Sequence, residues 1–230
     1  MSPASTAFVV GIGASAGGVE ALEHFFAGIP PSPNMSFIVV THLGSGRTSH
    51  MPDIIGRHTA LPVHSAQDDM LVENNQIYVL AADADISLSQ GRIKVAATAG
   101  ARKGRRPIDQ FFTSLAKDYG ARAVGVVLSG SDSDGTLGLK AIKEYGGITM
   151  AQTSNGNGPA YEEMSGSAIS AGIIDFALPA EEMGARLHQL DADFDLPFGP
   201  MAEDEDSGAV APEMENIKSE IYELLLTEAV

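Results

Sequence analysis

Short apolar runs alternate with segments of helical periodicity along most of the chain. Runs of this kind are typical of parallel strands buried on both faces, and apolar residues at i, i+3 and i+4 indicate helices that cover them. The expected strands are 8–13, 36–41, 61–64, 76–80, 123–128, 147–152 and 173–178, and the expected helices are 19–26, 49–58, 107–119, 136–145, 165–171 and 180–190. This alternation predicts an α/β fold with a doubly wound, mostly parallel sheet and helices on both faces.

One segment has a different period. Residues 86–95 alternate apolar and polar positions around Gln90-Gly91, which predicts an antiparallel hairpin. We expect this hairpin at one edge of the sheet.

The pattern changes again near the C-terminus. From Asp191 the chain becomes acidic, and residues 203–208 resemble a solvated linker. An apolar stripe follows on an expected tail helix, at Ile217, Ile221, Leu224 and Leu225. The predicted organisation is a catalytic domain at 1–190 and an acidic linker with an amphipathic helix at 191–230.

Composition narrows the function classes. The formal net charge of −16 argues against nucleic acid or an anionic membrane surface as the main partner. The absence of cysteine excludes disulfides, a thiolate nucleophile and cysteine metal sites. No apolar run is long enough for a membrane span, and the N-terminus lacks the pattern of a signal peptide. These features predict a cytoplasmic protein without membrane insertion.

The turn between the first strand and the first helix carries the first candidate chemistry. Ser15 stands there among small residues, at a strand-to-helix junction where a nucleophile is exposed beside a helix N-terminus. The same stretch, Gly11-x-Gly13-x-x-Ala16, also fits a dinucleotide-binding fingerprint. Close packing of helix on strand is a third explanation for the glycines.

The second strand favours the nucleophile. A dinucleotide site needs an acidic residue near the end of that strand, but His42 stands there instead. An imidazole is the base that a serine nucleophile requires. An NAD(P)-binding enzyme therefore remains as an alternative hypothesis, with less support.

A carboxylate follows the apolar run 123–128, at Asp132 or Asp134. Ligand sites form beyond the carboxyl ends of parallel strands, so these segments are expected to converge. Serine, histidine and aspartate together form a catalytic triad. Spacing alone does not choose between the two aspartates.

Several motifs resemble those of the chemotaxis protein-glutamate methylesterases, in order from about residue 8 to residue 190. They are GASAGG at 13–18, VVTHL at 39–43, VVLSGSDSDGTLG at 126–138 and AISAGIID at 168–175. PIDQFF at 107–112 is similar to the form of the family that is fused to a methyltransferase domain.

The resemblance implies roles for four residues. The nucleophile falls on Ser15, the base on His42 and the aspartate on Asp134, and the backbone amide of Ser131 falls on an oxyanion position. It implies hydrolysis of glutamate methyl esters on the cytoplasmic helices of chemoreceptors, deamidation of glutamines there, and no cofactor or metal. A methyltransferase domain and other chemotaxis or signalling proteins are the implied further partners.

The sequence departs from the family in two places. The residues printed before the first strand are too few to form the receiver domain that phosphorylation-regulated members carry, and residues 159–166 lack the Gly-Met-Pro that family members often carry. We therefore expect constitutive activity, or control by a partner that acts through the tail at 191–230. A non-catalytic scaffold that retains the fold is a further alternative.

Basic residues cluster in one loop of this acidic protein, at Arg102, Lys103, Arg105 and Arg106. Such a patch is complementary to an acidic partner. We expect it to help capture the receptor, and a solvated loop is the alternative.

Overall fold

The computed structural model describes residues 7–41, 50–80, 84–97, 105–153 and 158–194. The strands are β1 Phe8–Ala14, β2 Met35–Thr41, β3 Val63–Ser65, β4 Ile77–Val79, β5 Ala84–Ser89, β6 Arg92–Ala97, β7 Ala123–Val127, β8 Ile148–Gln152 and β9 Phe176–Leu178. The helices are α1 Gly18–Ala27, α2 Met51–Ile55, α3 Pro107–Tyr119, α4 Thr136–Glu144, α5 Glu163–Ser170 and α6 Ala180–Phe194, with a 3₁₀ turn at Gly120–Arg122.

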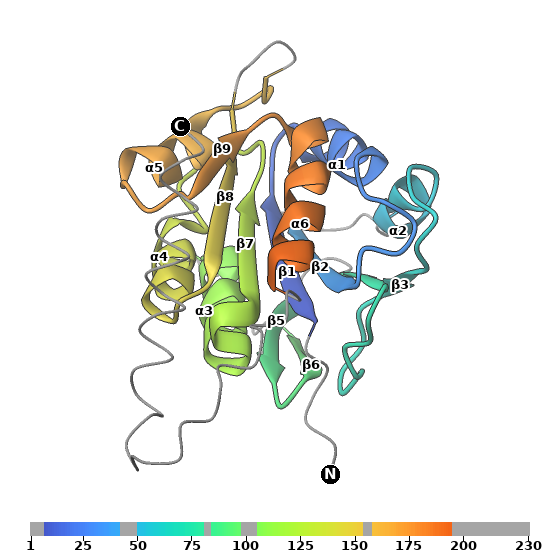
Figure 1. The fold of residues 1–230 in the computed structure, drawn as a ribbon. Coiled ribbons are helices and arrows are strands. Elements are labelled where there is room, and N and C mark those ends of the chain that lie inside the picture. The colour runs from blue at the N-terminus through green and yellow to red at the C-terminus, as the bar shows by residue number, and fades with distance from the viewer. Residues whose placement is uncertain (1–6, 42–49, 81–83, 98–104, 154–157, 195–230) are drawn as a thin grey trace, which may run out of the picture. The chain divides into compact units, whose positions relative to one another are not determined.

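A seven-stranded sheet forms the centre of this fold, with the order β3-β4-β2-β1-β7-β8-β9 (Figure 1). Every pairing between its neighbouring strands is parallel. The chain first builds the sheet outward from β1 through β2, and later adds β7, β8 and β9 on the other side of β1. The prediction of a doubly wound parallel sheet is confirmed, and the reversal of winding lies between β1 and β7.

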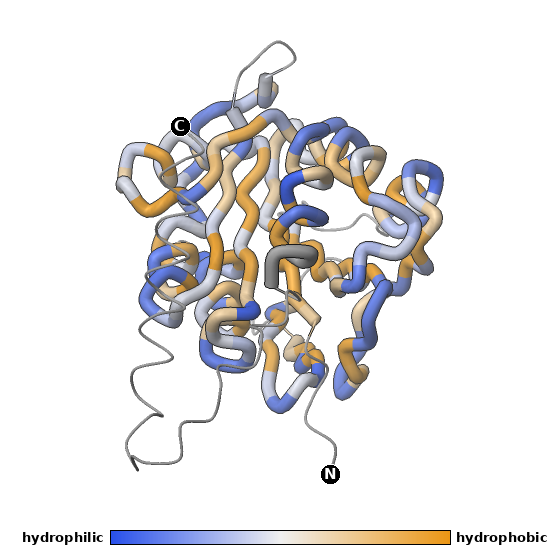
Figure 2. Tube along the Cα trace, in the orientation of Figure 1, coloured by the Kyte–Doolittle hydropathy of each residue, from blue (hydrophilic) through white to orange (hydrophobic). Residues whose placement is uncertain are grey.

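Helices cover both faces of the sheet, which explains why all seven residues of β1 are buried. On one face, a Cβ added at Gly13 would lie 2.5 Å from Ile108 of α3. On the other, Phe37 of β2 makes edge-to-face contacts with Phe25 and Phe26 of α1. Figure 2 shows the apolar residues concentrated along the central strands and the hydrophilic residues on the outer sides of the helices.

The hairpin β5–β6 is antiparallel as predicted, but it forms a two-stranded sheet of its own rather than an edge of the main sheet. The reason is its packing on α3. The backbone N–H of Leu88 donates to Ser114 Oγ at 3.0 Å, and Ile86, Leu88 and Ile93 are buried in the same core cluster as Phe111.

Several predicted boundaries shift, and two of the shifts have a local reason in the hydrogen bonding. Helix α2 is shorter than 49–58, because Arg57 and His58 bond three residues back, as in a tighter turn. Strand β9 begins later than 173, because the Asp175 side chain and not a backbone carbonyl accepts the N–H of Thr149, at 2.9 Å. Helix α6 continues past 190 to Phe194.

Internal contacts divide the chain into two units, Met1–Ala192 and Asp193–Val230. Apart from the end of α6, the second unit lies outside the described residues, and the predicted division at residue 190 stays a prediction. Over the described ranges, no helix combines the length and the apolar character needed to cross a membrane.

Two helical glycines allow a matched test of the contact between α1 and α6. A Cβ added at Gly184 in α6 would overlap the carbonyl group of Gly28, whereas one added at Gly166 in α5 would meet nothing within 4 Å. We expect Gly184→Ala to lower the free energy of unfolding by about 1–3 kcal/mol despite the better helix propensity of alanine. Gly166→Ala should raise it by about 0.5–1 kcal/mol. Urea unfolding of both variants measures this, and equal shifts would contradict the close contact of the two backbones.

Candidate functional site

The carboxyl ends of β1 and β7 meet at the point where the sheet reverses its winding. Gly13 pairs with Val127 in register, and beyond them the N–H of Ser15 donates to the carbonyl of Ser129 at 2.9 Å. The turn that carries Ser15 therefore lies directly against Ser129, near the start of the segment that follows β7. Ligand sites of open α/β sheets form at such a position.

Ser15 begins the turn from β1 into α1. Its carbonyl accepts the N–H of Gly18 at 2.9 Å, and its side chain is half-buried. Gly17 has a left-handed φ of 72°, and a Cβ there would lie 2.7 Å from Ser129 Oγ. The turn thus needs glycine at 17, and it places Ser15 just before the positive end of the α1 dipole.

The end of β2 reaches the same edge, since Thr41 pairs with Ala14 in register. His42, the predicted base, follows Thr41 directly and lies outside the described residues.

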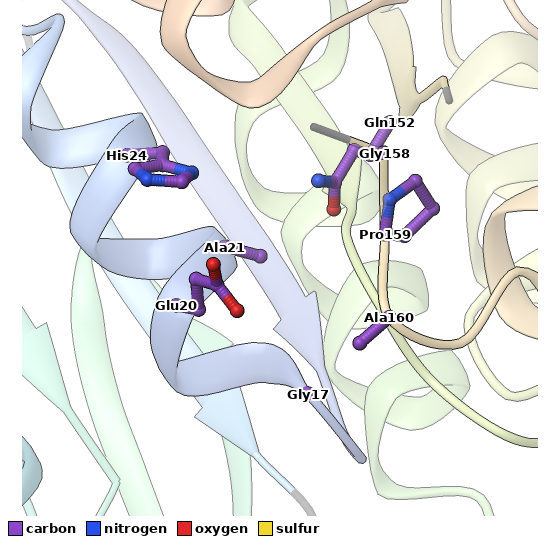
Figure 3. A pocket seen from close by; sticks show the side chains of 8 residues that line it. All are labelled: Gly17, Glu20, Ala21, His24, Gln152, Gly158, Pro159 and Ala160. Atoms are coloured by element: carbon purple, nitrogen blue, oxygen red, sulfur yellow. The ribbon is translucent and has the colours of Figure 1, made fainter. Parts of the chain in front are cut away.

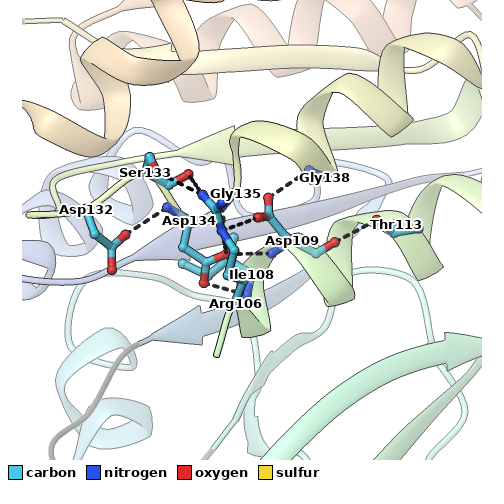
Figure 4. Close-up of polar contacts among 9 residues, drawn as sticks. All are labelled: Arg106, Ile108, Asp109, Thr113, Asp132, Ser133, Asp134, Gly135 and Gly138. Carbon is cyan, nitrogen blue, oxygen red and sulfur yellow. Dashed lines mark hydrogen bonds and ion pairs between the residues drawn. The ribbon is translucent and has the colours of Figure 1, made fainter. Parts of the chain in front are cut away.

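The carboxylate of Asp134 is 2% exposed and accepts three backbone N–H groups (Figure 4). Ile108 N donates to Oδ2 at 3.0 Å, and Asp109 N and Gly135 N donate to Oδ1 at 3.0 and 2.9 Å. The first two belong to the opening turn of α3, which otherwise lacks acceptors for them. Asp134 is therefore a buried carboxyl group held at a helix N-terminus, an arrangement that stabilises its ionised form.

Asp132 is placed differently. It is exposed, and its Oδ1 accepts the N–H of Asp134 at 2.8 Å. This bond shapes the turn that leads to Asp134. The two aspartates that the spacing left open are thus distinguished by burial and by their bonding partners.

Asp109 was not singled out from the sequence, although its side chain completes the set of hydrogen bonds around Asp134 and the starts of α3 and α4. Its Oδ1 accepts the N–H of Gly138 in α4 at 2.8 Å. Asp134, just before α4, thus caps α3, and Asp109 in α3 caps α4. Burial, then the charge of Asp134, raises the pKa of Asp109. The signal that could have found it is an acidic residue in the first turn after Pro107.

Ser129 is a second residue that the sequence did not single out. Its buried hydroxyl donates to the carbonyl of Ala16 at 2.8 Å and accepts the N–H of Tyr161 at 3.1 Å. Gly130 N also donates to the Tyr161 carbonyl, at 3.1 Å. Ser129 therefore ties the Ser15 turn and the segment before α5 to the end of β7.

Of the predicted basic cluster, Arg102 and Lys103 lie outside the described residues. Arg105 pairs with Asp85 at 2.5 Å, and Arg106 Nε lies 2.7 Å from Asp109 Oδ2. The charges of both arginines are thus partly compensated within the chain. Ser131, the predicted source of an oxyanion amide, is exposed in the turn after β7.

A small pocket adjoins this edge, between α1 and the segment 158–160 (Figure 3). Glu20 and His24 line it from α1, and Gln152 lines it from the end of β8. Gln152 is 3% exposed, and its Oε1 has no hydrogen-bond partner among the residues described. Such an oxygen favours a hydrogen-bond donor in the pocket.

Gly11 and Gly13 do not form a phosphate-binding turn. Both lie within β1, where added Cβ atoms would come within 2.7 Å of Phe111 and Leu115, or 2.5 Å of Ile108. Close packing of α3 on β1 explains these glycines, so the basis for the dinucleotide alternative is lost. Within the described ranges, no three histidine or acidic side chains gather as they would around a metal ion.

The fold and this edge define an α/β protein with a serine turn and a capped carboxylate at one end of its sheet, and known proteins resemble the chain in sequence and fold. Residues 10–187 match the family described as CheB methylesterase. The crystal structure of the Thermotoga maritima CheB methylesterase catalytic domain superposes with a TM-score of 0.72 and 25% identity, covering 80% of this chain and 99% of that one.

Two curated relatives agree with this match. A protein-glutamate methylesterase/protein-glutamine glutaminase of Anaeromyxobacter dehalogenans is 31% identical over 182 residues, which are 79% of this chain and 53% of that protein. Protein-glutamate methylesterase FrzG of Myxococcus xanthus is 30% identical over 182 residues, 79% of this chain and 54% of its own. A 104.1 kDa Rhodobacter capsulatus protein is 39% identical over 134 residues, only 14% of its length.

The chain belongs to the CheB methylesterase family. It spans about half the length of the curated methylesterases that it matches. The predicted family and fold class are confirmed, and the likeness to the fusion form stays a prediction.

Proposed function

We propose that this protein is a serine hydrolase that removes methyl groups from glutamate methyl esters on chemoreceptor helices. The observation that carries the proposal is the buried, capped carboxylate of Asp134 beside the Ser15 turn at the carboxyl edge of the sheet. Relatives named protein-glutamate methylesterase support the substrate class.

The proposed mechanism uses Ser15, His42 and Asp134 as a triad. Ser15 Oγ attacks the ester carbonyl while His42 takes its proton, and Asp134 orients the imidazole and stabilises its charged form. The bond to the methoxy oxygen then breaks, and methanol leaves with that proton. Water attacks the acyl-enzyme in the same way and releases the glutamate carboxylate and the serine. The amide of Ser131 is the proposed oxyanion donor.

The same chemistry extends to glutamine. Attack on a side-chain amide would release ammonia in place of methanol and leave glutamate, in line with relatives that are also named protein-glutamine glutaminase. This mechanism requires no cofactor or metal. The proposed setting is the cytoplasm, where the receptor helices are exposed, with a methyltransferase domain or other signalling proteins as further partners.

Capture of the receptor is proposed for Arg102 and Lys103. A protein of charge −16 would repel the carboxylates that surround methylated glutamates. Arg105 and Arg106 are engaged in ion pairs, so the other two residues are the better candidates from the cluster.

A methylated receptor fragment tests the proposed function. The full chain is expected to release methyl groups from the fragment, with mass spectrometry identifying the residues that become glutamate. A fragment with glutamines at the same positions tests deamidation. Folded protein that changes neither fragment nor a simple activated ester would contradict the proposal and favour the non-catalytic scaffold.

A further inference from the structure

We propose that Arg106 is a positioning residue that holds Asp134 ionised and correctly oriented for the reaction, with Asp109 as the second anchor of the same network. This inference rests on the proposed function for its catalytic consequence, but its structural basis is independent of the substrate.

The network places two buried carboxylates against one another. Asp134 is 2% exposed and Asp109 is 7% exposed, and the N–H of Asp109 donates to Asp134 Oδ1 at 3.0 Å. Burial and like charge both disfavour the ionised forms of such a pair. Burial, and after it the charge of Asp134, accordingly raises the pKa of Asp109.

Arg106 supplies the opposite charge for both (Figure 4). Its Nε lies 2.7 Å from Asp109 Oδ2 and 3.9 Å from Asp134 Oδ1. A guanidinium stays protonated at all relevant pH values, so its charge favours the ionised form of each carboxylate. A further carboxylate, that of Asp132, contacts the same residue, because its Oδ1 accepts the backbone N–H of Asp134 at 2.8 Å.

The same guanidinium also fixes the backbone that carries Asp134. An Nη atom of Arg106 donates to the carbonyl of Ser133 at 2.6 Å and to its hydroxyl at 2.8 Å. Arg106 thus contacts both Ser133, the residue before Asp134, and Asp109 in the first turn of α3, which Asp134 caps. Loss of these bonds would let the turn 133–134 move relative to α3. A small displacement of a triad member lowers turnover strongly.

The neighbouring Arg105 offers a matched control. It carries the same charge and makes an ion pair of its own, with Asp85 at 2.5 Å. That pair joins Arg105 to strand β5 of the hairpin, whereas Arg106 pairs with Asp109 and Asp134. Neutralising either arginine changes the net charge equally, so a difference between the two variants isolates the network.

The experiment compares Arg106→Gln, Arg106→Lys and Arg105→Gln in the full chain, with a small neutral ester as substrate. We expect Arg106→Gln to lower kcat about tenfold with little change in KM, and to move the acidic limb of the pH profile to higher pH. Arg106→Lys keeps the charge, so the acidic limb should stay at the position seen in the unmodified protein. Its kcat should lie between those of Arg106→Gln and the unmodified protein, because an ammonium cannot reproduce the guanidinium bonds to both Ser133 and Asp109. Arg105→Gln should match the unmodified protein.

An independent measurement separates this inference from the proposed function. NMR titration of the Asp134 carboxyl should show a higher midpoint in Arg106→Gln than in the unmodified protein, and no change in Arg105→Gln. An active enzyme with an unchanged pH profile and unchanged Asp134 titration in Arg106→Gln would overturn the inference and leave the function standing. An inactive protein that shows the shifted titration would overturn the function but retain the role of Arg106 in holding the carboxylate ionised.

Discussion

Replacement of Ser15 by alanine is expected to lower ester hydrolysis by about 10⁴-fold or more, because it removes the proposed nucleophile. The fold should survive. Ser15 is half-buried in a turn, and its backbone N–H bond to the Ser129 carbonyl, at 2.9 Å, does not depend on the side chain. Turnover of an activated ester and urea unfolding, measured on the same preparation, separate the two effects.

A matched serine supplies the control. Ser89 is exposed at the end of β5 in the hairpin, far along the chain from the serine turn. Ser89→Ala should retain the original rate and stability. If Ser15→Ala also hydrolyses the ester at the original rate, Ser15 is not the nucleophile, whatever else the site binds.

Much of the fold could be predicted because its signals are local. The apolar runs of β1, β2 and β7 are long enough to indicate strands buried on both faces, and Pro107 marks the start of α3. The hairpin was recognisable from Gln90-Gly91, whose φ values of 55° and 71° fit a two-residue turn. The position of the hairpin relative to the main sheet could not be predicted, because it depends on packing against α3, a tertiary contact that sequence periodicity does not reveal.

The positions of candidate site residues could be predicted where they follow directly from the end of a strand. Ser15 follows β1 and Asp134 follows β7, and adjacent parallel strands bring their carboxyl ends together. What remained hidden depends on side chains that bond to distant backbone. Ser129 joins Ala16 to Tyr161, and Asp109 reaches Gly138, and no sequence spacing encodes these contacts.

The basic cluster is a second case in which the sequence does not predict the contacts of the side chains. Four basic residues in one loop predict a surface patch, and Arg105 and Arg106 belong to it by sequence alone. Each instead has a carboxylate within the chain, Asp85 for the first and Asp109 for the second. Charge clustering identifies a loop with unusual electrostatics, but the partner of each charge depends on the fold.

Replacement of Asp134 by asparagine is expected to have the second largest effect, a fall in kcat of about 10²- to 10⁴-fold. Asparagine retains the shape but not the charge that stabilises the imidazolium of His42. It also presents an NH₂ group where the carboxylate accepts N–H groups from Ile108, Asp109 and Gly135. At least one donor then loses its acceptor, so the free energy of unfolding should fall by about 1–3 kcal/mol.

Asp132→Asn is the control that separates loss of the Asp134 charge from loss of a nearby carboxylate. Asp132 Oδ1 accepts the N–H of Asp134 at 2.8 Å, and the amide oxygen of asparagine can accept the same N–H. Asp132 is exposed, so this variant should stay within about 0.5 kcal/mol of the original stability and within a few-fold of its kcat. Steady-state kinetics should be measured at temperatures where unfolding shows every variant to be fully folded, so that lost stability does not appear as lost turnover. Equal losses of kcat in the two variants would show that burial and capping do not identify the catalytic aspartate. A large loss in Asp134→Asn alone would assign the carboxylate of the triad, because only the residue held by α3 and α4 then supplies the charge.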